Sequence, residues 1–276
     1  MIPTISIVFM AISALVSIGL PVAMGIIWHK RTGARASSLL IGAAVFVVFA
    51  GILENICHGL VLYGSGSCAA FMQSNLWAYG LYGALAAGVF EETGRFCAFK
   101  LLFKNKNDRC ESVMYGIGHG GVEAVLVSGL TMISYIVISV IVNAYGGMAG
   151  LAALGIGEDT VSVLMTAFTD TEPVMYLVSC IERIMAMAFH ISMSVLVFAA
   201  VKQEGRGWYY PLAIGLHALL DLGAMAFQTG LIKSIIATEG YVLVFTALCA
   251  LLAVRVYRGM AEQRREPDQN YTVDKE

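Results

Sequence analysis

Charged residues are scarce in this chain. Only 13% of its 276 residues are Asp, Glu, Lys or Arg, whereas 58% are apolar, and the mean hydropathy is +0.77. This composition excludes a water-soluble domain. The apolar runs exceed the roughly 18 residues that indicate a transmembrane helix, and transmembrane β-strands need only about 9–11 alternating residues. The sequence therefore predicts an all-α polytopic membrane protein.

Several common motifs are also missing. The six cysteines are scattered and form no CxxC pair, so the sequence contains neither a disulfide framework nor a cysteine metal motif. The HExxH motif of soluble zinc proteases is absent, and so is the internal repeat typical of inverted-repeat transporters. The first apolar segment, Ile5–Trp28, is too long for a signal peptide and has no basic start. We expect it to be a retained span.

Seven apolar segments have the length of a membrane span. They cover residues 4–28, 37–63, 76–103, 112–143, 173–201, 208–229 and 240–257. Most of the 17 basic residues follow the first, third, fifth and last of these segments, on one side of the membrane. The positive-inside rule then predicts an N-terminus outside and a cytoplasmic C-terminus. We expect residues 1–257 to form a single transmembrane domain and residues 258–276 a flexible cytoplasmic tail.

The longest connection, between residues 143 and 172, is predicted to lie outside. It contains four acidic residues and no basic residue, and its middle, Met148–Ile156, is apolar and rich in glycine. Such a stretch is expected to lie at the membrane interface, to form a short re-entrant segment, or to be an eighth, broken span.

Two adjacent glutamates and an arginine interrupt the third predicted span. Glu91, Glu92 and Arg95 lie within five residues, and each charge near the bilayer centre costs about 2.5–3.5 kcal/mol on insertion scales. Arg95 is four residues from Glu91 and three from Glu92, so it can pair with either carboxylate on one helix face. Taken alone, this pattern fits an ion pair that locks helices together as well as it fits a functional site.

Other spans carry histidines and acids at a similar depth. His119 and Glu123 are four residues apart in a glycine-rich run, and His217 and Asp221 have the same spacing, so each pair shares one helix face. With His190 and Glu91, they lie roughly 10–20 Å from the predicted cytoplasmic ends of their spans. A single such pair is usually structural, and glycines usually mark close helix packing. Four spans that place these groups at one level indicate a functional site facing a polar cavity.

A second polar group lies nearer the predicted outer side. It consists of Glu54, His58, Glu182 and Arg183. We interpret this group as structural and expect an ion pair between Glu54 and Arg183.

Two mechanisms of hydrolysis fit the inner group. In the first, imidazoles and carboxylates hold a metal such as zinc, and Glu91 is the general base. The candidate ligands are His119, Glu123 and His217, with His190 or Asp221 as the fourth.

In the second mechanism no metal takes part. Glu91 activates water directly, while His119 and His217 stabilise the oxyanion. Arg95 holds Glu92 ionised and orients the glutamate pair in this scheme.

Three motifs follow one another in the chain: EExxR at residues 91–95, HxxxE at 119–123 and HxxxD at 217–221. In this order they resemble the signature of the CAAX-protease/bacteriocin-processing and PrsW superfamily of intramembrane proteases. Within it, the segments GHGGVEA, ERIMAMAFH and HALLD are similar to the YhfC group. The resemblance covers about residues 5–257. CAAX-type members usually have EExxxR, so a prenylated substrate is not implied.

The resemblance implies a helical bundle whose cavity opens to the membrane and the cytoplasm. It also implies a peptidase that cuts near the ends of membrane segments in a bacterial-type plasma membrane. The expected partners are the lipid bilayer and a membrane protein or peptide substrate, with no nucleic acid. Carried over by motif, the catalytic residues are Glu91, Glu92, Arg95, His119, Glu123, His217 and Asp221.

Two other functions fit the same residues. In an ion- or proton-coupled transporter, the buried acids and histidines would relay ions across the membrane. In a catalytically silent scaffold they would serve structure alone. The superfamily also resembles the non-catalytic scaffold subunit of γ-secretase, and a fold by itself does not determine activity.

Overall fold

The computed structural model describes residues 1–104, 108–147, 149, 151, 155 and 157–262. Every regular element within these residues is helical. The elements are α1 (Thr4–Thr32), α2 (Ala36–Phe46), η1 (Val47–Glu54), α3 (Asn55–Val61), α4 (Ser67–Ser74), α5 (Leu76–Leu101), α6 (Cys110–Ala124), η2 (Val125–Gly129), α7 (Leu130–Ala144), α9 (Glu158–Asp170), α10 (Val174–Lys202), α11 (Tyr209–Gln228) and α12 (Ile235–Glu262). The symbol η denotes a π-helix.

The all-α membrane architecture predicted from the composition is confirmed. Six helical stretches in the described part of the chain are long and apolar enough to cross a membrane. Helix α5 covers the remaining predicted span and has 26 residues, but it is not among these six stretches. The count of seven spans and the orientation of the termini stay predictions.

Two predicted features fall wholly or largely outside the described residues. Most of the apolar stretch Met148–Ile156 is among them, and so are residues 263–276 of the tail predicted for residues 258–276, whose residues 258–262 belong to α12. Helix α9, which follows the first of these, has 13 residues. A helix of that length reaches about 20 Å, less than the roughly 30 Å of a bilayer core.

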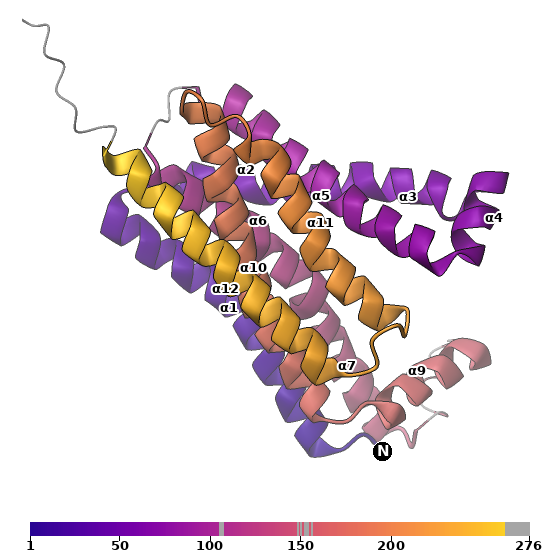
Figure 1. Cartoon of the computed structure of the whole chain (residues 1–276). Coiled ribbons are helices and arrows are strands. Elements are labelled where there is room, and N and C mark those ends of the chain that lie inside the picture. The colour runs from indigo at the N-terminus through magenta and orange to yellow at the C-terminus, as the bar shows by residue number, and fades with distance from the viewer. Residues whose placement is uncertain (105–107, 148, 150, 152–154, 156, 263–276) are drawn as a thin grey trace, which may run out of the picture.

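Helix α10 lies at the centre of the bundle. It packs against α1, α5, α6, α11 and α12, and it is the most buried of the six candidate spans. In Figure 1, α3, α4 and the first half of α5 extend to one side of the bundle, while the N-terminus lies beside α7 and α9. The side chain of Asn143 fixes this N-terminus through hydrogen bonds with both backbone groups of Ile2.

Two of the long helices contain a π-helical stretch. Segment η1 ends at Glu54, and η2 begins two residues after Glu123. A π-helix changes the direction in which the flanking side chains point, and such stretches are frequent at functional sites. Both acidic residues therefore adjoin a local departure from α-helical geometry.

Close packing of α2 against α6 depends on two glycines. A Cβ atom on Gly42 would collide with the carbonyl oxygen of Tyr115, and one on Gly118 would collide with the carbonyl oxygen of Leu39. The glycine-rich run around His119 is thus a helix contact, as expected. The contact also brings the ring of Phe46 onto the edge of the His119 ring, with the centroids 5.2 Å apart.

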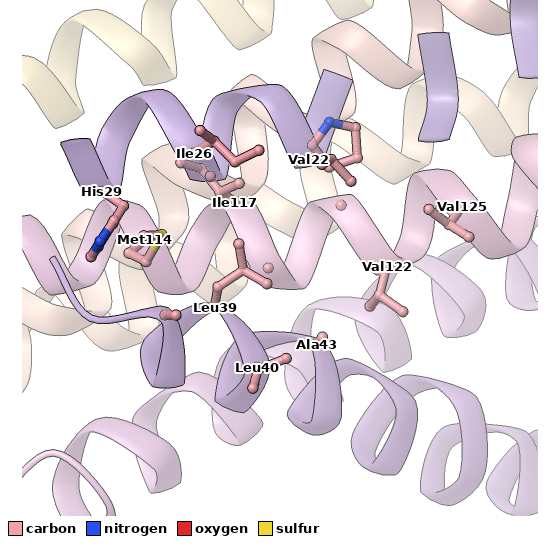
Figure 2. Close-up of a pocket in the computed structure, with 15 residues that line it drawn as sticks. Val22, Ile26, His29, Leu39, Leu40, Ala43, Met114, Ile117, Val122 and Val125 are labelled. Atoms are coloured by element: carbon pink, nitrogen blue, oxygen red, sulfur yellow. The ribbon is translucent and has the colours of Figure 1, made fainter. Parts of the chain in front are cut away.

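An apolar cavity of about 520 Å³ lies between α1, α2 and α6. Figure 2 shows that its labelled lining residues are almost all aliphatic, with His29 at one end. The lining includes none of the polar site residues predicted from the sequence. This cavity therefore belongs to the apolar flank of the bundle.

We predict that Gly118→Ala destabilises the protein by about 1–3 kcal/mol, the usual cost of overpacking. The new methyl group meets backbone atoms of α2, which cannot rotate away. Thermal unfolding in detergent measures the effect. Gly19→Ala in α1 is the matched control, since a Cβ there has nothing within 4 Å. Equal stability of the two variants would contradict the proposed contact.

Candidate metal centre

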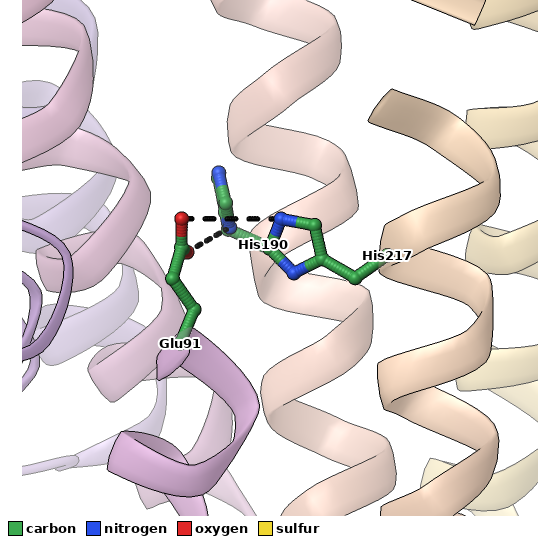
Figure 3. A group of neighbouring side chains, drawn as sticks. All are labelled: Glu91, His190 and His217. Atoms are coloured by element: carbon green, nitrogen blue, oxygen red, sulfur yellow. Dashed lines mark ion pairs between the residues drawn. The ribbon is translucent and has the colours of Figure 1, made fainter. Parts of the chain in front are cut away.

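Three buried side chains from three helices place possible metal ligands together. Glu91 of α5, His190 of α10 and His217 of α11 each offer an atom within 4.8 Å of the other two. Oε2 of Glu91 is 3.6 Å from Nδ1 of His190, and Oε1 is 3.9 Å from Nε2 of His217. Figure 3 shows the carboxylate of Glu91 pointing toward both imidazole rings.

The guanidinium of Arg95 lies beside this group and is completely buried. It pairs with Glu92 and, at 3.5 Å, with Glu91. The predicted intrahelical pairing is therefore confirmed, and it involves both carboxylates. The Nη2 atom of Arg95 also lies 2.6 Å from Nδ1 of His190. Because a guanidinium can only donate, this ring nitrogen accepts.

His217 is fixed by the second glutamate of the pair. Its Nδ1 is 2.7 Å from Oε1 of Glu92, which accepts the N–H because an ionised carboxylate has no proton to donate. The other nitrogen, Nε2, then carries a lone pair directed at Glu91 and at Asp221, which lies 3.6 Å away. One end of the ring is anchored, and the other is free to bind a ligand.

His190 has the same arrangement on the opposite side. Its Nε2 contacts a carboxylate oxygen of Glu123 from α6. The other oxygen of Glu123 accepts a hydrogen bond of 2.8 Å from Arg183. The N–H of His190 thus points at Glu123, while Nδ1 accepts from Arg95 and lies 3.6 Å from Glu91. A histidine that donates one ring N–H to a carboxylate is the usual geometry of a metal-binding imidazole. For Nδ1 of His190 to bind a metal, the guanidinium of Arg95 has to move away from it.

The arrangement can therefore accommodate a divalent cation. Two imidazole nitrogens and one carboxylate lie within 4.8 Å of one another, the nitrogen of His190 also accepting from Arg95, and each imidazole is held through a carboxylate by an arginine. We call each chain of imidazole, carboxylate and arginine a relay. The relay from His217 runs through Glu92 to Arg95. The relay from His190 runs through Glu123 to Arg183.

His119 lies next to this group and not within it. Its Nε2 is 2.8 Å from Oε2 of Glu91, and its ring stacks on Tyr115 with centroids 5.9 Å apart. Its Nδ1 is buried and has no hydrogen-bond partner among the described residues. His119 is thus placed to hold the carboxylate of Glu91.

The structure brings together every residue of the predicted inner site. Of the four predicted ligands, His190 and His217 belong to the group of three, whereas His119 and Glu123 each contact one of its members. Glu91, predicted as the base, is the third member. Asp221 is 30% exposed and borders the cavity described below.

The predicted ion pair between Glu54 and Arg183 is wrong. Arg183 pairs with Glu123, because α10 packs along α6, and Glu54 contacts His58 one helical turn away at 3.2 Å. Sequence reasoning thus missed the part that Arg183 plays in the site. A signal was present, since Arg183 precedes His190 by seven residues, or two helical turns on one face.

A cavity of about 250 Å³ leads away from the site. It passes the ends of α10, α11 and α12 that adjoin the α9–α10 and α11–α12 connections, and its lining includes Glu182, Ala224 and Val242. Exposure rises along it, from 9% for the Glu91 side chain to 30% for Asp221 and 38% for Glu182.

The opposite end of the site is closed by aromatic rings. The four rings belong to Phe99, Phe103, Tyr115 and Phe198, which are at most 1% exposed. The ring of Phe99 contacts the other three, and Phe103 also contacts Tyr115, with centroids 4.6–5.9 Å apart. This aromatic layer separates the site from the basic loops. The cavity that the resemblance implies, open to the membrane and the cytoplasm, stays a prediction.

Comparison with known proteins agrees with this geometry. Residues 12–242 match the family described as YhfC intramembrane metalloprotease. The chain belongs to the YhfC family. It is also 35% identical, over 254 residues, to the "Uncharacterized membrane protein YhfC" of Bacillus subtilis (strain 168), covering 92% of this chain and 97% of that protein. No solved structure matches. Membership of the larger superfamily stays a prediction.

We predict that cysteines placed in the cavity react from the end that carries the α11–α12 connection. Ala186→Cys and Ala224→Cys, made after replacement of the six native cysteines, line the cavity. Sealed vesicles of each orientation are treated with a membrane-impermeant maleimide.

Two exposed reference positions mark the sides: Lys233→Cys for the α11–α12 end and Glu204→Cys for the α10–α11 end. Ala98→Cys, buried beside the aromatic layer, is the unreactive control. The assignment fails if Ala186→Cys and Ala224→Cys react from the same side as Glu204→Cys.

Proposed function

We propose that this protein is an intramembrane endopeptidase whose metal ion is held by Glu91, His190 and His217. The observation that carries the proposal is the matched orientation of the two imidazoles. Each imidazole contacts a carboxylate that is paired with an arginine, and each turns its other nitrogen toward Glu91, although in His190 that nitrogen also accepts from Arg95. A structural hydrogen-bond network does not require two lone pairs to face the same carboxylate.

The donor set favours zinc. Two histidines and one glutamate, with a further position left for water or substrate, are typical of catalytic zinc sites. A zinc ion bound there supplies Lewis acidity, which polarises a peptide carbonyl and makes water a better nucleophile. Membership of a family described as intramembrane metalloproteases supports the same chemistry.

The roles of the other site residues are assigned from their contacts. Asp221 borders the cavity beside His217 and is the most exposed acid of the site, so it takes the proton of the attacking water. Glu92 and Arg95 hold His217, and His119 orients Glu91. This assignment makes Glu91 a ligand and moves the base to Asp221, unlike the scheme expected from the motifs.

The substrate class follows from the surroundings. The site lies inside a helical bundle and is reached through a cavity that contains charged side chains. We propose that the substrates are membrane-embedded proteins of a bacterial-type plasma membrane, and that their peptide bonds are cleaved at this site.

We predict that the purified protein retains one equivalent of zinc and cleaves members of a library of transmembrane peptides. Glu91→Gln and His217→Ala should lose both the metal and activity. Asp221→Asn should keep the metal and lose activity by about a hundredfold or more, the usual contribution of a general base. Elemental analysis and peptide cleavage measure these effects.

The variants also separate the alternatives. Cleavage without metal and resistant to chelators, but abolished in Glu91→Gln, would reject the metal centre in favour of direct activation of water by Glu91. Cleavage that survives both Glu91→Gln and His217→Ala would reject the site itself. Ion uptake in proteoliposomes without cleavage of any peptide would favour a transporter.

We further predict that Arg183→Gln weakens metal binding about 10- to 100-fold, as loss of outer-shell partners commonly does. The change leaves Glu123 without the cation that fixes it, so His190 is no longer held in place. Competition with a chromophoric chelator measures the affinity. Glu182→Gln is the control, since Glu182 lies 3.9 Å from Arg183 but does not contact His190 in the described structure. Equal effects of the two changes would contradict the relay.

A further inference from the structure

A second polar cavity lies at the other end of the bundle, and none of its lining residues belongs to the candidate metal centre. Its volume is about 720 Å³, and it lies between the α10–α11 connection and the last turns of α12. Three arginines line it: Arg206, Arg255 and Arg258. No carboxylate is among its described lining residues. The cavity is therefore positively charged.

Three other basic residues at this end of the bundle have partners within the protein. Lys202 donates to the carbonyl oxygen of Phe103, and Arg109 donates to that of Tyr257. Arg35 lies 3.9 Å from Glu111. These side chains support helix ends and loops.

The arginines of the cavity differ from these. Arg255 and Arg258 are exposed and form no ion pair with any described residue. Arg206 donates to the hydroxyl of Tyr209, a neutral group, at 3.2 Å. Three cations thus line one concave surface without a compensating anion from the described chain. Such a surface favours an anionic ligand.

The same face of α12 continues as an apolar stripe. Val244, Leu248 and Leu251 are 59%, 60% and 68% exposed. They precede Arg255 and Arg258 at alternating spacings of four and three residues, so all five share one helix face. Leu251 is about 6 Å along the axis from Arg255, toward the centre of the span. Together, the apolar stripe and the arginines form a surface that fits a ligand with an anionic head and an apolar chain.

We propose that this cavity binds an anionic phospholipid. The phosphate lies between the three guanidinium groups, and an acyl chain runs along Val244, Leu248 and Leu251. Basic pockets between transmembrane helices on the cytoplasmic side suit anionic headgroups, and the basic loops of this chain predict that orientation. A free phosphate would satisfy the arginines but would gain nothing from the apolar stripe.

Native mass spectrometry of the full chain tests the proposal. The protein is incubated with phosphatidylglycerol, phosphatidylcholine, sn-glycerol 3-phosphate or inorganic phosphate, and retained molecules are counted. The expected result is specific retention of phosphatidylglycerol. The triple variant Arg206→Gln/Arg255→Gln/Arg258→Gln should retain it about tenfold less, since each basic residue near an anionic lipid contributes to binding.

The control variant Lys30→Gln/Arg31→Gln/Lys104→Gln removes the same charge from positions outside the cavity and should retain the lipid as the unmodified chain does. Equal loss of lipid retention in both triple variants would show that net charge alone causes the effect, and it would overturn the proposed site. Leu251→Asn should lower retention of the lipid and leave binding of glycerol phosphate unchanged.

Two further results would overturn the lipid assignment. Inorganic phosphate or glycerol phosphate retained as well as phosphatidylglycerol would make the cavity a site for soluble phosphate. Phosphatidylcholine retained equally would show that the anionic charge does not matter. If the triple variant does not fold, Arg258→Gln alone is measured against Lys30→Gln with the same criteria. Thermal unfolding in detergent, followed in parallel, distinguishes loss of the lipid from general unfolding.

Discussion

The structure depends on one buried cation. Arg95 has no exposed surface and lies between Glu91, Glu92 and His190. Removing one partner from a buried ion pair commonly costs about 3–5 kcal/mol, because the other charge remains uncompensated. Without Arg95, two adjacent carboxylates would face each other inside an apolar bundle. Their presence in α5 is tolerable because the arginine accompanies them on the same helix.

Arg183 repeats this arrangement from another direction. It neutralises Glu123, and Glu123 in turn fixes His190, just as Arg95 neutralises Glu92 and Glu92 fixes His217. Each relay ends on an imidazole whose other nitrogen faces Glu91. The charges in the spans therefore form one connected network, which explains how four helices can share so many ionisable groups. The glycine contact between α2 and α6 supports this network by pressing Phe46 against His119.

Much of this could be predicted from the sequence. Hydropathy located the helices within a few residues, since each span must be continuous and apolar. The pairing of Arg95 with both glutamates followed from helical spacing alone. The pairing of Arg183 with Glu123 did not follow from the sequence, because it depends on how α6 packs along α10, which no local pattern encodes. The aromatic layer was not predicted for a similar reason: Phe99 and Phe198 are ordinary apolar residues in the sequence, and they meet only when α5 and α10 pack together.

The spacing of the donors along the chain also has a consequence for biogenesis. Glu91 and Arg95 are synthesised together, so α5 enters the membrane with part of its charge already neutralised. His190 and His217 follow about a hundred residues later on α10 and α11. The nascent protein therefore holds an incomplete donor set until its penultimate helix is in place. The buried charges of α5 are thus in the membrane before the imidazoles that contact them.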